Sequence, residues 1–260
     1  MRLEYVPVAL LVALGAFVGV NAVRDARARA RKHDAAVVAR DTTMISGGVV
    51  QGSVRRALIP VGKGSTIPPD EMRRRVANLA SGTYINDILG EQDSALYRWP
   101  DHIVDALRVY IAPTAPIANW NARYPELARG VFGEWSEAGF PLHFTFIYDS
   151  ASADITIRWV DRFPSEDGKR IGVTDRVQTS AFEIAKAHVA IANHDSTGRL
   201  LSPTTVDGVI RHEVGHALGL NHARDPSSVM YRESATSTIG NSDRATLRLL
   251  YLVPGGSLKE

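Results

Sequence analysis

The chain contains no cysteine in its 260 residues. This absence excludes disulfide bridges and thiolate zinc sites, so any metal must be held by nitrogen and oxygen ligands. An excess of charge of one sign is also missing, because the formal net charge is only +2. Nucleic-acid-binding proteins usually carry a clustered basic face, and we therefore expect no nucleic acid partner. Hydrophobic residues make up 45% of the chain, which is enough for the core of a soluble domain.

An unbroken apolar run occupies residues 6–20. Its length lies between the core of a signal peptide and a membrane-spanning helix of about 20 residues, so residues 1–23 are predicted to be a signal peptide or a membrane anchor. Val20 and Ala22 suit the positions before a signal-peptidase cut. The basic flank that follows favours the cytoplasm, and a buried core helix is a third alternative. We expect a secreted or membrane-anchored protein outside the cytoplasmic membrane; its orientation and oligomeric state stay open.

Residues 24–94 are predicted to be a linker followed by a propeptide-like or bracing segment. Charged stretches and stretches rich in Gly, Ser and Pro fill residues 24–70, which is typical of a solvated linker. A short helix is predicted at residues 68–82, because three apolar side chains share one face there: Met72, Val76 and Leu79. The sequence does not decide whether this segment is removed.

Residues 95–260 have the pattern of one α+β domain. Strands are predicted where β-branched and aromatic residues gather, and helices where apolar residues recur with a period near 3.6. The predicted strands are residues 106–112, 142–148, 153–160, 170–178 and 185–193, and the predicted helices are residues 125–139, a helix that begins near 202, and residues 242–253. The order is therefore strand, helix, four strands, helix, helix.

Three of the eight histidines lie in one short stretch, HEVGHALGLNH at residues 212–222. On a helix, His212 and His216 share one face about 6 Å apart and can aim two imidazoles at one zinc ion. Glu213 then lies beside the metal, within reach of a water on it. Gly219 permits the left-handed turn that ends the helix, and His222 supplies a third nitrogen. Three protein ligands leave one position open for water, which indicates a catalytic site.

The alternative is an accidental set of core or surface histidines. Because the extended pattern fixes five positions, its chance occurrence in a chain of this length is about one in 10⁵. The segment resembles HExxHxxGxxH, the zinc motif of the metzincin metalloendopeptidases. Downstream, SSVMY resembles their methionine turn, and Tyr231 directly follows Met230 as in the matrixin branch, the matrix-metalloprotease type. Asp243 falls where an aspartate of that family supports the turn.

This resemblance, over roughly residues 95–260, implies a zincin-like catalytic domain. It implies a twisted, mixed, mostly parallel sheet of about five strands with three main helices, and a zinc site on the second helix. One catalytic Zn²⁺ would be held by His212, His216 and His222, above a site floor of Met230 and Tyr231, with support from Gly219 and Asp243. Calcium has no support in the sequence.

The resemblance also implies a zinc metalloendopeptidase. Glu213 would activate a zinc-bound water that hydrolyses a peptide bond. A protein or peptide substrate would pair as an extended strand with an edge strand over residues 171–177, whose first positions are Ile171, Gly172, Val173 and Thr174.

Some features depart from the matrixin pattern. Matrixin zymogens cap the zinc with a propeptide cysteine, which this chain lacks, so latency would need another mechanism. His188 lacks the partners of a structural zinc and is predicted to be a strand histidine. The Pro-x-Tyr segment that walls the specificity pocket is missing after Met230, so side-chain preference stays open. The alternatives are a non-proteolytic zinc-binding interaction module of the same fold, and a zinc enzyme that attacks a non-peptide bond.

Overall fold

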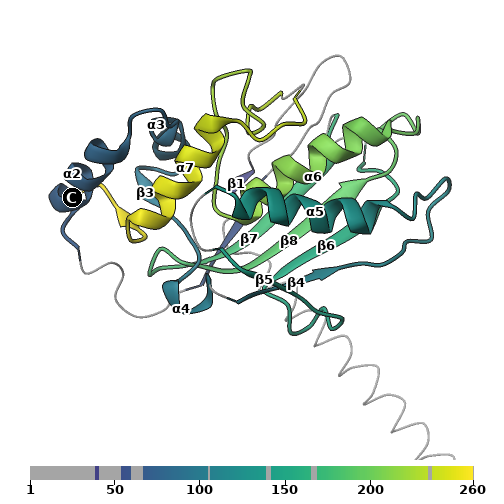
Figure 1. Ribbon diagram of the computed structural model, residues 1–260, viewed down its shortest axis with the longest axis horizontal. Helices are drawn as coiled ribbons and strands as arrows, with labels where there is room; N and C mark the ends of the chain where they lie inside the picture. The colour runs from purple at the N-terminus through teal and green to yellow at the C-terminus, as the bar shows by residue number, and fades with distance from the viewer. Residues whose placement is uncertain are drawn as a thin grey trace, which may run out of the picture. The chain divides into compact units, whose positions relative to one another are not determined.

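The computed structural model describes residues 39–40, 54–59, 67–104, 106–138, 142–164, 169–233 and 236–259 (Figure 1). All of them belong to one compact unit, residues 39–260. The predicted signal peptide or membrane anchor at residues 1–23 lies outside the described residues. Within the described ranges, none of the helices has the length and apolar character needed to cross a membrane.

The described part of the chain forms a sheet of seven strands in the order β1-β2-β7-β8-β6-β4-β5. Strands β4, β5, β6 and β8 run parallel to one another, β7 runs antiparallel to β8, and β2 is parallel to β7. The strands are β1 (Ala39–Arg40), β2 (Val54–Ile59), β4 (Leu107–Ile111), β5 (Phe144–Phe146), β6 (Ile155–Val160), β7 (Gly172–Thr179) and β8 (Ile184–Ala192). The five from β4 to β8 are those that the sequence predicts, and the expectation of a mixed, mostly parallel sheet is confirmed.

Strands β1 and β2 were not expected, because they lie in the stretch predicted to be a linker. β2 pairs with β7 from Val54 opposite Thr174 to Ile59 opposite Thr179, and β1 pairs with β2. The linker prediction is therefore wrong for residues 54–59. A strand at the edge of a sheet forms main-chain hydrogen bonds with its neighbouring strand. Because that neighbour, β7, lies more than 100 positions later in the chain, the local sequence of residues 54–59 does not predict the pairing.

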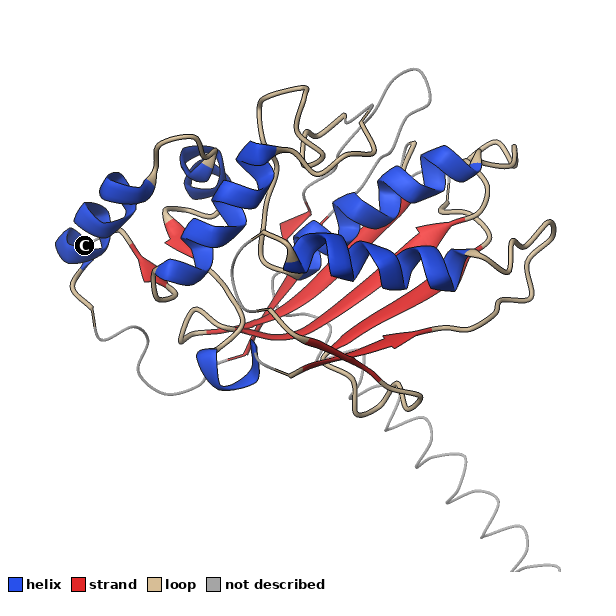
Figure 2. Cartoon of the chain, in the orientation of Figure 1, coloured by secondary structure: helices blue, strands red, loops and turns tan. Residues whose placement is uncertain are grey.

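Two helices cover one face of the sheet, α5 (Tyr124–Ser136) and α6 (Pro203–Ala217), which lie side by side in Figure 2. The sheet supplies a buried row to the core, as in β4, where Leu107, Val109 and Ile111 alternate with more exposed residues. α5 contributes Val131, Phe132 and Trp135 to the same core. α6 is buried along most of its length, which is the burial that a helix carrying a metal site needs to exclude competing water.

A second group of elements lies at one end of the sheet (Figure 1). It joins α2 (Pro69–Leu79), α3 (Ile85–Glu91), β3 (Ala95–Leu96) and the short α4 (Asp101–Val104) to α7 (Asn241–Leu252) and β9 (Gly256–Ser257). β3 pairs with β9, and the main-chain nitrogen of Tyr84 donates to the Thr246 hydroxyl of α7 at 3.0 Å. Met72 and Val76 of α2 are buried as predicted, whereas Leu79 is 40% exposed. Residues 67–96 thus pack against the C-terminal helix.

Candidate metal centre

Helix α6 carries the first two histidines of the motif on one buried face. The helix begins after Ser202, whose hydroxyl accepts from the Thr205 main-chain nitrogen at 3.0 Å. Both His212 and His216 are fully buried. Between them, a Cβ on Gly215 would lie 2.4 Å from the Met230 sulfur. Only glycine at this position lets the methionine lie so close to the helix.

The hydrogen bonds of the two imidazoles fix which nitrogen faces the site. His212 Nδ1 lies 2.7 Å from the Val229 carbonyl oxygen, and His216 Nδ1 lies 2.9 Å from that of Leu220. A carbonyl oxygen only accepts, so each Nδ1 must carry the hydrogen. In the neutral ring this leaves each Nε2 as an acceptor. The two Nε2 atoms lie 3.0 Å apart.

Two acceptor nitrogens that face each other in a buried site require a cation or a proton between them. Burial, and after it the charge of His222, lowers the pKa of His212 to about 3, and burial lowers that of His216 well below its ordinary value. A proton is therefore a poor occupant at neutral pH. One ring nitrogen from each of His212, His216 and His222 lies within 4.8 Å of the others. This donor set fits a divalent zinc ion, which favours imidazole nitrogen.

The third histidine reaches the site through the turn at Gly219. Gly219 has φ +109°, its nitrogen donates to the His216 carbonyl oxygen, and the Leu220 nitrogen donates to that of Gly215. The predicted left-handed turn is therefore confirmed. The buried Arg176 of β7 contacts both sides of this turn. Its guanidinium donates to the His216 carbonyl oxygen at 3.2 Å and to the Asn221 side chain at 2.6 Å. No sequence pattern indicates this role of Arg176.

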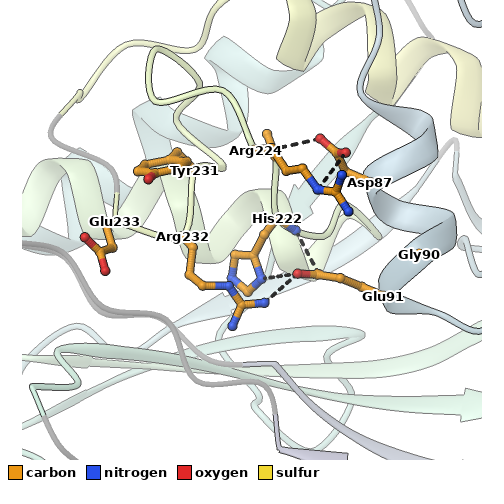
Figure 3. Close-up of a pocket in the computed structure, with 9 residues that line it drawn as sticks. Asp87, Gly90, Glu91, His222, Arg224, Tyr231, Arg232 and Glu233 are labelled. Carbon is orange, nitrogen blue, oxygen red and sulfur yellow. Dashed lines mark hydrogen bonds and ion pairs between the residues drawn. The ribbon is translucent and has the colours of Figure 1, made fainter.

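His222 is held by a residue that the sequence did not single out, Glu91 at the end of α3 (Figure 3). His222 Nδ1 lies 3.2 Å from Glu91 Oε1, and the His222 main-chain nitrogen donates to Glu91 Oε2 at 3.2 Å. Arg232 donates to Glu91 Oε1 at 2.5 Å. Burial on its own raises the pKa of Glu91, but these contacts with His222 and Arg232 lower it to about 2. These residues line a pocket of about 520 Å³ that Tyr231 also borders.

Glu213 points towards β7 rather than to solvent. The Thr174 hydroxyl lies 2.6 Å from Glu213 Oε2 and 3.0 Å from the Glu213 main-chain oxygen, so it donates a hydrogen bond to this residue. Glu213 Oε1 has no hydrogen-bond partner among the described residues, and a Cβ on Gly172 would lie 2.4 Å from it. Burial raises the pKa of Glu213 well above its ordinary value, against the opposing effect of the Thr174 hydrogen bond.

The predicted substrate edge is partly covered in this structure. Thr174 is the first residue of β7 with a partner in β2, and the pairing continues to Thr179. Ile171, Gly172 and Val173 lie before this register, close to Glu213. Pairing of a substrate with this edge stays a prediction. At residues 174–177, substrate could pair with β7 only after β2 has moved away from it.

The segment predicted to be a methionine turn, residues 227–231, lies against helix α6. Met230 is buried against α6, and Asp243 accepts from the Val229 nitrogen at 3.2 Å and from the Gly240 nitrogen at 2.8 Å, as well as from the Ser228 hydroxyl. Asp243 thereby ties the turn to the start of α7. His188 lies on β8, where its Nδ1 is 2.8 Å from the Thr156 hydroxyl, in agreement with a strand histidine.

The comparisons with known proteins agree with this geometry. The chain is 28% identical over 123 residues to a protein of Heliothis virescens ascovirus 3e named "Putative matrix metalloproteinase". That match spans 42% of this chain and 26% of the relative, so the chain spans much less than the whole length of that relative. The family model described as Matrixin matches residues 101–252, more than half of the chain and every element of the site except α3. The chain belongs to the matrixin family.

Proposed function

We propose that this protein is a zinc-dependent metalloendopeptidase. The observation that carries the proposal is the set of three buried histidines, each of which brings one ring nitrogen within 4.8 Å of the other two. His212, His216 and His222 would hold the zinc ion. A bound zinc supplies a Lewis acid that acidifies water and polarises a peptide carbonyl.

The residues of the chain supply the proton transfers. Glu213 Oε1, which has no hydrogen-bond partner among the described residues, accepts a proton from the attacking water and passes it to the leaving amine. Thr174 holds Oε2, so the carboxylate keeps one orientation during both transfers.

The substrate is a protein or peptide in extended conformation along β7. Secretion or membrane anchorage, with the catalytic unit outside the cytoplasmic membrane, is part of the proposal. It rests on the apolar run at residues 6–20. Recovery of the catalytic unit from the medium or from the membrane fraction tests it.

Glu213→Gln tests the reaction itself. The amide keeps the shape of the side chain but cannot accept the proton, so we expect zinc binding to persist and hydrolysis of an unfolded protein such as casein to fall by a factor of about 10² to 10⁴. A chelator should abolish the wild-type activity, and added zinc should restore it. Hydrolysis by the variant at the wild-type rate would refute the assigned base. A wild-type chain that binds zinc but cleaves no peptide in a library would favour the non-proteolytic module.

A further inference from the structure

The three histidines differ in what holds them. His212 and His216 are oriented by main-chain carbonyl oxygens of Val229 and Leu220, which are neutral acceptors from segments adjoining the site. His222 is oriented by a carboxylate from Glu91, 131 positions earlier in the chain. The third ligand therefore depends on α3, an element that lies outside the region matched by the family model.

The Glu91 carboxylate fixes both the ring and the main chain of His222. Its Oε1 lies 3.2 Å from His222 Nδ1, and its Oε2 accepts from the His222 nitrogen at 3.2 Å. Because a carboxylate accepts, His222 Nδ1 carries the hydrogen and Nε2 is left to face the other imidazoles, whose ring centroids lie 4.8 and 5.6 Å away.

Arg232 and α3 keep this carboxylate in place (Figure 3). Arg232, two residues after Met230, donates to Glu91 Oε1 at 2.5 Å. One turn earlier on α3, Asp87 accepts from the Arg224 main-chain nitrogen at 2.9 Å and lies 3.4 Å from the Arg224 guanidinium. Asp87 therefore contacts Arg224, two residues beyond His222, rather than the His222 ring.

We infer that Glu91 is a positioning residue that orients His222 towards the metal, and that residues 67–96 are consequently a working part of the catalytic unit. The inference rests on the proposed function. A carboxylate on the remote nitrogen of a metal-bound imidazole fixes the tautomer and raises the basicity of the ligand, and the loss of such a partner typically weakens metal binding 10- to 100-fold. Any processing that releases a mature enzyme must then leave α3 in the chain.

The test compares Glu91→Gln, Glu91→Ala and Asp87→Asn in the full chain. Zinc affinity is measured by competition with a chelator, and the cobalt-substituted proteins are compared by absorption spectroscopy, which reports the ligand geometry. We expect about 10- to 100-fold weaker zinc binding for Glu91→Gln, at least as large a loss for Glu91→Ala, and an altered cobalt spectrum for both. Asp87→Asn is the matched control, because it changes an acid of the same helix that does not touch His222. Its zinc affinity should stay within about threefold of wild type.

The outcomes separate this inference from the proposed function. If wild type binds zinc and both Glu91 variants bind it equally well, Glu91 does not position the ligand. If Asp87→Asn loses as much affinity as Glu91→Gln, the effect belongs to the docking of α3, and the positioning role is refuted. A fall in the urea midpoint of the metal-free Glu91 variants with unchanged zinc affinity also contradicts it. If wild type itself binds no zinc, the proposed function fails and this inference fails with it.

Discussion

At the scale of single residues, the centre contains three glycines at which an added side chain would force neighbouring atoms to move or strain the backbone. Gly215 admits the Met230 sulfur, Gly172 admits Glu213 Oε1, and Gly219 turns the chain towards His222 with φ +109°. The sequence motif contains Gly219 and so reveals its role. The roles of Gly172 and Gly215 depend on the Glu213 carboxylate and the Met230 sulfur, which lie close to them only in the folded chain. The local sequence therefore does not predict these roles.

Gly219→Ala should damage both the fold and the metal site. The left-handed backbone strains any side chain, and the new Cβ would lie 2.9 Å from the Tyr97 carbonyl oxygen. We expect a loss of about 1–3 kcal/mol in the free energy of unfolding, measured by urea denaturation, together with weaker zinc binding.

Gly130→Ala is the control for this substitution. Gly130 lies within α5, and a Cβ there would meet nothing within 4 Å. This variant should be unchanged or more stable by up to about 1 kcal/mol. Equal stability and equal zinc affinity of the two variants would contradict the role given to the turn.

At the scale of elements, the sequence predicts what is periodic and misses what depends on distant partners. The helix and strands predicted for residues 106–193 are present as α5 and as β4 to β8. Each of them buries one face, and the spacing of its apolar residues along the chain indicates that face. β2 escapes prediction, since its pairing needs the free edge of β7. The role of Glu91 could not be predicted for the same reason. Nothing in the sequence around this acid, at the end of a short helix, indicates that it will contact His222.

Strand β2 should compete with substrate for the edge of β7. It occupies the main-chain groups of residues 174–179, and a competitor in the same chain acts at an effective concentration of about millimolar. A variant that lacks residues 1–60 should therefore show kcat/KM for an extended peptide at least about tenfold higher than the full chain, a difference of about 1.4 kcal/mol.

A variant that lacks only residues 1–38 retains β1 and β2 and is the matched control. Its kcat/KM should equal that of the full chain. Urea denaturation must show that both truncated proteins are folded. Equal cleavage by the two folded variants would show that β2 does not obstruct the substrate.

At the scale of the whole molecule, the centre joins elements from both ends of the described chain. α6 brings His212 and His216, α3 holds His222 through Glu91, and α7 holds the methionine turn through Asp243. β7 supports Glu213 and the glycine turn through Thr174 and Arg176. A metal bound here links helices and sheet, so its binding free energy adds to the stability of the entire unit.

The most direct measurement is zinc titration of the metal-free full chain, followed by X-ray absorption at the zinc edge. We expect one tightly bound zinc ion per chain, with three imidazole nitrogens at about 2.0–2.1 Å and one further light ligand. His212→Ala, His216→Ala and His222→Ala should each weaken binding severely. If the chain retains no zinc, or binds it without all three of these imidazoles, the three histidines do not form the proposed metal centre.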